Sequence, residues 1–157
     1  MKRIAVFADV QNIYYTTRQA YGRQFDYRKL WQRLSAQGSI VSAMAYAIHR
    51  ADEKQQKFRD ALQHIGFTVK LKPYIQRSDG SAKGDWDVGI TIDILETANS
   101  VDSIVLLSGD GDFDLLLHKI TNDYGVNAEV YGVPSLTANS LIEAASRYHR
   151  IDEDLLL

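Results

Sequence analysis

The chain has 157 residues, a length typical of a single domain, and its 20 acidic and 18 basic side chains leave a net charge of −2. This balance excludes a globally basic surface, so any contact with nucleic acid must use local basic groups. The absence of cysteine excludes disulfides, thiolate catalysis and cysteine zinc sites, and it is compatible with the cytoplasmic location that we expect. No apolar run approaches the roughly 20 residues of a membrane-spanning helix, and we expect no membrane association.

Strands and helices are predicted to alternate along the chain. Apolar runs bounded by turn residues predict five strands, at residues 3–8, 40–48, 67–71, 103–107 and 127–131. Helical periodicity predicts helices at residues 9–19, 27–37, 53–65, 87–98, 112–122 and 137–147. This alternation is typical of an α/β domain in which helices cover both faces of a mainly parallel sheet, here of about five strands.

The ends of the chain and one internal stretch lie outside this pattern. We expect residues 1–150 to form the domain and residues 151–157 to be a tail that either docks on a neighbour or frays. Residues 74–84 are polar and contain two glycines, so we expect them to be the least ordered stretch when no substrate is bound.

An apolar strand runs directly into a series of carboxylates near residue 110. Residues 105–107 are followed by Ser108, Asp110, Asp112 and Asp114. In an open α/β sheet this junction lies at the carboxyl end of a strand, where ligands bind. Neighbouring carboxylates repel one another unless a cation or protons intervene, so we predict a divalent-metal site.

The four polar side chains of this stretch have different predicted roles. Asp110, the first acid after the strand, is the best ligand candidate, and Asp114 lies one helical turn above it on the same side. Asp112 is a candidate catalytic residue, with N-capping of the next helix as an equal alternative. Ser108 is expected to hydrogen-bond a carboxylate or a substrate phosphate.

Asp9 follows the first strand in the same way as Asp110 follows its own strand. An N-cap of the next helix would explain Asp9 alone. It would not explain Asn12, which lies one turn into that helix, where it can orient Asp9 or a metal-bound water.

Asp87 begins a helix and faces the apolar side of it. At 100° per residue, Asp87 falls within the arc formed by the apolar side chains of residues 88–98, whereas Asp93 falls outside it. The helix dipole favours a carboxylate there, but burial is costly, so Asp87 needs a partner such as a metal or an arginine. The alternative is a capping aspartate at the edge of the core. Asp93 is expected to be structural or to face solvent.

The candidate ligands are all oxygen donors, and this selects magnesium or manganese over zinc. The four histidines, His49, His64, His118 and His149, show no ligand spacing. Each is expected to be an ordinary surface or core residue.

Three segments resemble the signature blocks of the NYN domain family, a group of PIN-like ribonuclease relatives that includes the LabA-like bacterial proteins. The segments are FADVQN at 7–12, KGDWDV at 83–88 continuing to Asp93, and LSGDGDF at 107–113, and they occur in the family's order. The resemblance implies a three-layer α/β/α PIN-like (Rossmann-like) fold. It also implies an Mg²⁺- or Mn²⁺-dependent nuclease that hydrolyses phosphodiester bonds, above all of RNA, by a metal-activated water.

The resemblance also assigns site residues. By block, Asp9, Asp87 and Asp110 match the family's metal-binding acids, Asn12 and Asp112 match its accompanying polar positions, and Asp114 matches a further acid of some relatives. One residue more than the commonest spacing precedes Asp87, which leaves open whether Asp85 or Asp87 enters the site. The acid that many PIN nucleases carry on an earlier helix has only Glu53 as a candidate here.

Local groups are the candidates for contact with the expected partner, single-stranded or structured RNA. Lys83 and Arg50 are candidates for phosphate binding and Tyr14 for base stacking, with ordinary surface or core roles as the alternative. A homodimer is a further option. The alternative function is a catalytically weak or inactive module that binds RNA or a protein partner. A phosphatase of the haloacid dehalogenase type is disfavoured because Gln11 stands where a second aspartate is needed, and no glycine fingerprint of a dinucleotide-binding fold is present.

Overall fold

The computed structural model describes residues 1–49, 53–73, 75–76, 82–83 and 85–157, with the backbone alone for residues 73, 75, 76, 82 and 83. Six strands form one parallel sheet in the order β3-β2-β1-β6-β7-β8. They are β1 (Arg3–Asp9), β2 (Ser39–His49), β3 (Thr68–Pro73), β6 (Ser103–Leu107), β7 (Asn127–Gly132) and β8 (Arg147–Arg150). The strand order reverses between β1 and β6, which makes this the topological switch point of the sheet.

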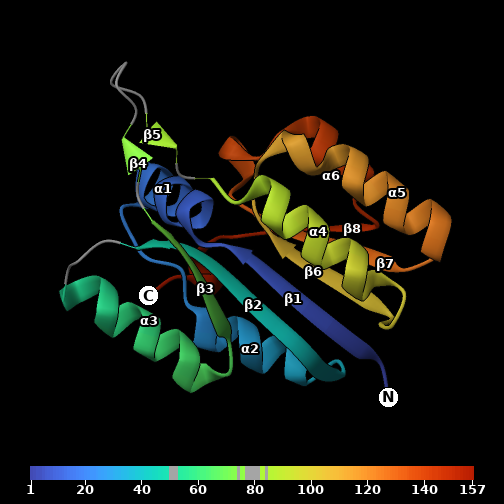
Figure 1. The fold of residues 1–157 in the computed structure, drawn as a ribbon, viewed down its shortest axis with the longest axis horizontal. Coiled ribbons are helices and arrows are strands. Elements are labelled where there is room, and N and C mark those ends of the chain that lie inside the picture. Colours follow the sequence, from blue (N-terminus) through green and yellow to red (C-terminus); the bar gives the residue numbers. More distant parts are fainter. Residues whose placement is uncertain (50–52, 74, 77–81, 84) are drawn as a thin grey trace.

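Helices cover both faces of the sheet, as Figure 1 shows. One layer contains α1 (Val10–Tyr21), α2 (Tyr27–Ser35) and α3 (Glu53–Ile65), and the other contains α4 (Asp87–Ala98), α5 (Asp114–Tyr124) and α6 (Asn139–Ala144). The predicted three-layer α/β/α fold is therefore confirmed. Short 3-10 turns follow three of the strands: η1 (Gly111–Phe113), η2 (Pro134–Leu136) and η3 (Glu153–Leu155). Two short strands, β4 (Ile75–Gln76) and β5 (Ala82–Lys83), pair antiparallel within the stretch predicted to be least ordered.

The central strand β1 explains why the two cores are separate. Ile4, Val6 and Ala8 pack into the core beneath α1 to α3, whereas Ala5 and Phe7 pack into the core beneath α4 to α6. Because successive side chains point to opposite faces, a strand buried on both sides needs a continuous apolar run. Residues 4–8 supply that run and are almost fully buried.

The sheet has six strands where about five were predicted, because a helix was predicted to continue to residue 147. Helix α6 ends at Ala144, and Arg147–Arg150 forms the edge strand β8 instead. The strand has no apolar run, so its pattern did not predict it. Its side chains nevertheless alternate between the two faces: Tyr148 packs against the α4–α6 core, and His149 stacks on Tyr131 of β7.

Helix α4 buries a narrower face than its sequence predicted. Ile90, Ile94 and Ala98 are buried at four-residue spacing, whereas Val88 and Ile92 are 72% and 49% exposed. A helix that packs on a sheet at one stripe leaves the residues on its far side in solvent, whatever their hydrophobicity.

The chain after β8 is docked. Leu155 and Leu156 are buried in the α1–α3 core. The Asp26 amide donates to the Leu155 carbonyl at 2.7 Å, and the Leu157 amide donates to the Gln24 carbonyl at 2.8 Å. Of the two alternatives predicted for this tail, docking is therefore the one observed. Within the described residues, none of the helices combines the length and the apolar character needed to cross a membrane.

Candidate metal centre

The site lies where the topology predicts a ligand, at the carboxyl ends of β1 and β6. The two strands are neighbours in parallel register, with Ala8 opposite Leu107. Asp9 ends β1, and the Ser108–Asp110 loop leaves β6 directly beside it. The two acidic segments, about 100 positions apart in the chain, are thus brought to one edge of the sheet.

Ser108 and Asn12 connect these two segments. The Ser108 hydroxyl donates to Oδ2 of Asp9 at 3.0 Å and accepts from the Asp110 amide at 3.1 Å. The Asn12 side-chain oxygen accepts from the Gly109 amide at 2.8 Å. The Asn12 side chain therefore orients the loop after β6, whereas the Asn12 backbone amide is the part that lies near Asp9. Ser108 is fully buried, which favours the carboxylate over a phosphate among its two predicted contacts.

Gly109 allows the loop to pass under the η2 turn. A Cβ atom at this position would lie only 2.6 Å from the Leu136 carbonyl oxygen, whereas the glycine lets the Ala138 amide donate to the Gly109 carbonyl at 3.1 Å. This close approach of two backbones fixes the loop that carries Asp110.

Three carboxylates converge beside this loop. One oxygen from each of Asp87, Asp110 and Asp112 lies within 4.8 Å of the others. Asp110 also accepts from the Asp112 amide at 2.9 Å, so Asp110 caps the η1 turn. Asp112 was predicted, as an alternative, to cap the next helix, but Phe113 occupies the N-cap position of α5. Asp112 lies within η1 instead, and its carboxylate joins the group.

Burial and nearby like charges raise the pKa values of two acids at the site, Asp87 and Asp9. Burial, followed by the neighbouring charge of Asp110, raises the pKa of Asp87 to about 7, with smaller contributions from Asp85 and Asp9. Burial raises the pKa of Asp9 to about 6, although the Ser108 hydrogen bond and the nearby Asn12 amide partly offset it. An arrangement that makes carboxylates hold protons near neutral pH is one that a cation would relieve.

Not every predicted acid joins the group. Asp9 lies beside it, buried and hydrogen-bonded to Ser108. The carboxylate of Asp114 accepts from the Leu115 amide at 2.6 Å and lies outside the group. Asp87 contributes to the group, whereas Asp85, the exposed residue two positions before it, does not. Glu53 is exposed at the start of α3 and is also outside the group.

The predicted substrate contacts are only partly described. Tyr14 is 44% exposed on α1, and its hydroxyl accepts from Arg18 at 2.8 Å. Lys83 lies in β5, but its side chain is outside the described part of the chain, and Arg50 is outside it altogether. Phosphate binding by these two residues stays a prediction.

Sequence reasoning missed the residues that hold α4 against the sheet. The Trp86 indole donates to the Ala47 carbonyl on β2 at 2.9 Å. About two turns further along, Asp93 accepts from the Tyr46 hydroxyl and from Lys70, each at 2.7 Å. Asp93 is therefore structural, which is one of the two roles predicted for it, the other being a side chain that faces solvent. The only signal in the sequence was a tryptophan directly before Asp87, which by itself does not indicate a partner on another strand.

Comparisons with known proteins show the family and the fold to which the chain belongs. A family model described as "NYN domain" matches residues 3–152. The low amplitude and bright protein LabA of Synechococcus elongatus is 32% identical over 154 residues, which cover 93% of this chain and 82% of that protein. The crystal structure of a protein of unknown function from Vibrio parahaemolyticus is 52% identical and superposes with a TM-score of 0.95, covering 99% of this chain and 96% of that one. The chain therefore belongs to the NYN domain family, a family of PIN-like nucleases.

Proposed function

We propose that this NYN domain is an Mg²⁺- or Mn²⁺-dependent nuclease that hydrolyses phosphodiester bonds, with RNA as its substrate. The observation that carries the proposal is the convergence of Asp87, Asp110 and Asp112, whose carboxylate oxygens lie within 4.8 Å of one another at the switch point of the sheet. Family membership supports nucleic acid as the class of partner.

The donor set fits a hard divalent cation. All three groups are carboxylates, which suit magnesium and manganese better than zinc. The raised pKa of Asp87 has Asp110 as its main charged cause, so a dication between the two would remove the repulsion that their approach creates. Two of the three groups are half-buried and the third is exposed, which leaves the site accessible to a phosphate.

Different side chains of the site have different proposed roles in hydrolysis. Asp87, Asp110 and Asp112 would hold the ion, which when bound supplies a Lewis acid and makes water a better nucleophile at phosphorus. Asp9 lies beside them with a pKa of about 6, so near neutral pH it can take up a proton released by the attacking water, or serve as a further ligand. Ser108 and Asn12 keep the loop of Asp110 in place. Asp114 stays a proposed outer ligand, Lys83 and Arg50 proposed phosphate contacts, and Tyr14 a proposed stacking partner for a base.

The test is cleavage of end-labelled single-stranded RNA by the purified protein with Mn²⁺, with Mg²⁺ and with a chelator, beside DNA of the same sequence. We expect metal-dependent cleavage of RNA that Asp110→Asn abolishes. The asparagine retains Oδ1, which caps η1, so the fold should survive. Asp123→Asn, on the exposed end of α5, is the control and should cleave like the wild type. Undiminished cleavage by Asp110→Asn would refute the role of Asp110.

A second candidate is a module that binds RNA or a protein partner without cutting RNA. It is favoured by one observation: Glu53, the candidate for the acid that many PIN nucleases carry on an earlier helix, is exposed and outside the carboxylate group. Retained RNA binding with no cleavage in either metal would support this candidate. Light scattering on the same sample tests the predicted homodimer.

A further inference from the structure

Helix α4 begins without a side-chain cap. Trp86 occupies the N-cap position with φ −113° and ψ 17°, and its side chain makes no capping hydrogen bond. Serine, threonine, aspartate and asparagine are preferred there, and losing such a cap costs about 1 kcal/mol. The next residue is Asp87, which the charge of Asp110 repels. The Asp85 carboxylate accepts from the Asp87 amide only at the long distance of 3.4 Å. Contacts beyond this weak local one must therefore help to hold the first turn of α4 in place.

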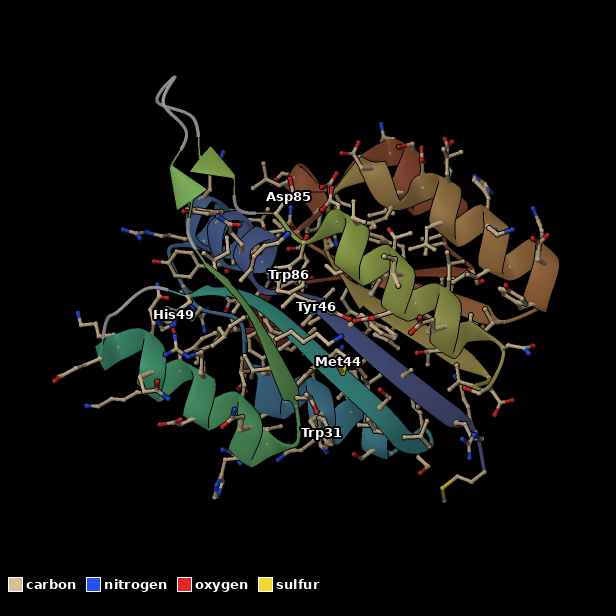
Figure 2. All side chains as sticks on the ribbon, viewed as in Figure 1. Trp31, Met44, Tyr46, His49, Asp85 and Trp86 are labelled. Carbon is tan, nitrogen blue, oxygen red and sulfur yellow. The ribbon has the colours of Figure 1, made fainter. Side chains whose placement is uncertain are left out.

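The Trp86 indole ties this turn to the sheet. Its N–H donates to the Ala47 carbonyl of β2 at 2.9 Å. Its ring lies 5.4 Å from the Tyr46 ring, centroid to centroid, and the Lys72 ammonium of β3 lies 4.9 Å from the indole centroid. Figure 2 shows Trp86 and Tyr46 together beside the start of α4. These contacts connect one side chain of the helix terminus to two neighbouring strands.

Gly89 makes room for the indole. A Cβ atom at this position would lie 2.6 Å from Cε3 of Trp86. A glycine inside a helix costs about 1 kcal/mol relative to alanine, and α4 includes it in its first turn. The ring therefore sits directly on the helix backbone, next to the residue whose carboxylate faces Asp110.

We infer that Trp86, seated on Gly89, is a positioning residue that holds Asp87 in the carboxylate group. The part of this inference that concerns metal binding rests on the proposed function. The anchoring of α4 by Trp86 can be tested in the absence of metal. Trp86 contacts neither metal nor substrate in this role: it acts through the backbone that it fixes.

Trp31 provides a matched control. It makes the same kind of contact, because a Cβ atom at Gly66 would lie 2.6 Å from Cη2 of Trp31, and its ring packs on Phe67 at 5.3 Å. It lies on α2, in the other helical layer (Figure 2). Trp86→Phe and Trp31→Phe therefore remove similar packing, but only the first lies beside the carboxylates.

The first measurement is Mn²⁺ affinity by isothermal titration calorimetry, with thermal unfolding of each variant alongside. We expect Trp86→Phe to bind Mn²⁺ about tenfold more weakly than the wild type, as is usual when a group that orients a ligand is removed. Trp31→Phe should lower the melting temperature to a similar extent but change the affinity less than twofold. Equal affinity of Trp86→Phe and the wild type, or an equal loss in both variants, would overturn the inference.

Gly89→Ala separates positioning from helix stability. Alanine is the better helix former, so local propensity alone would leave the metal affinity unchanged or improve it. We expect the affinity to fall about tenfold, because the new methyl group displaces the indole from its seat. An affinity equal to that of the wild type would count against the role of the Trp86–Gly89 contact.

Hydrogen exchange of the metal-free protein tests the anchor directly. The Ile90 amide donates to the Trp86 carbonyl at 2.8 Å and reports on the first turn of α4. We expect this amide to exchange faster in Trp86→Phe and at the wild-type rate in Trp31→Phe; unchanged exchange in Trp86→Phe would overturn the anchoring. If the wild type bound no Mn²⁺, the metal centre and the role of Trp86 toward a metal would both be refuted. Normal wild-type binding with no loss in Trp86→Phe would refute the inference alone.

Discussion

The buried carboxyl of Asp9, beside the proposed metal centre, lowers the stability of the fold when it is charged. It is 8% exposed at the end of β1, and burial raises its pKa to about 6. A carboxyl whose pKa is raised by folding destabilises the protein once pH exceeds the unfolded value, and the loss is complete above the folded value. For Asp9 that window runs from pH 3.8 to about pH 6.

Asp9→Asn should therefore stabilise the metal-free protein at pH 8 by on the order of 3 kcal/mol. At pH 3, where the carboxyl is protonated in both states, the substitution should make little difference. Thermal unfolding in the presence of a chelator at the two pH values measures this, with the exposed Asp123→Asn as control. The same effect at both pH values would show that the buried charge is not its cause.

Among individual residues, the sequence predicted the carboxylates of the site better than the residue that holds α4 beside them. Asp87 and Asp110 were predicted to be ligands because acids that follow apolar strands of a parallel sheet, or begin its crossover helices, gather at one edge. Asp112 was predicted to be a catalytic residue or an N-cap, and its carboxylate lies with theirs. Asp114 was predicted from its spacing and from the family resemblance, but its carboxylate accepts a hydrogen bond from the adjacent Leu115 amide and lies outside the group. Trp86 was not predicted, because its partner is a carbonyl on a strand 39 positions away in the chain.

At the scale of elements, two residues bind α4 to the sheet. Trp86 does so beside the proposed metal centre, and Asp93 does so away from it. Asp93 bonds Tyr46 of β2 and Lys70 of β3. Asp93→Asn should lower the free energy of unfolding by about 1 to 2 kcal/mol because it weakens charge-assisted hydrogen bonds. It should change Mn²⁺ affinity far less than Asp87→Asn does. Calorimetric titration of both variants with Mn²⁺ gives this ranking. A larger loss of affinity in Asp93→Asn than in Asp87→Asn would contradict a structural role for Asp93 and a metal-binding role for Asp87.

The docked tail is an element that the sequence left open. Leu155 is fully buried, whereas Leu157 is 66% exposed. Leu155→Ala should cost about 2 to 4 kcal/mol of stability, as is usual for a buried leucine, and Leu157→Ala should cost little. Urea unfolding of the two variants makes the comparison, and similar midpoints would mean that the tail does not contribute to the core.

The elements with strong periodicity were predicted well, and those without it were not. Helix α3, at Glu53–Ile65, and helix α4, at Asp87–Ala98, have the predicted bounds. Strand β8 was missed because its sequence, Arg-Tyr-His-Arg, carries no apolar signal, and its pairing with β7 is decided by the neighbouring strand. Local periodicity does not predict the order of the strands in the sheet either, because that order depends on contacts between distant segments.

Across the whole molecule, acids at opposite ends of the sheet give stability opposite dependences on pH. Toward the amino ends of the strands, the hydrogen bond from His149, with help from Ser103 and Lys2, lowers the pKa of the buried Glu129 to about 2. This acid stabilises the fold above about pH 4.5, and its contribution is lost as pH falls toward 2. Asp9 and Asp87 act in the opposite sense, and stability is lost as pH rises from 3.8 to between 6 and 7.

The metal-free protein should therefore be most stable near pH 4 to 5 and less stable at pH 8, and Mn²⁺ at pH 8 should restore the loss. The physical reason is that a dication neutralises the carboxylates whose repulsion appears at high pH. Thermal unfolding across this pH range, with Mn²⁺ and with a chelator, tests the prediction. A metal-free melting temperature that rises steadily up to pH 8 would contradict it.

The most direct test of the metal centre is anomalous scattering from crystals grown with Mn²⁺. We predict one strong anomalous peak within about 2.2 Å of carboxylate oxygens from both Asp87 and Asp110, with Asp112 bound directly or through water. Absence of a peak at saturating Mn²⁺, or a peak bound by other residues, would contradict the account.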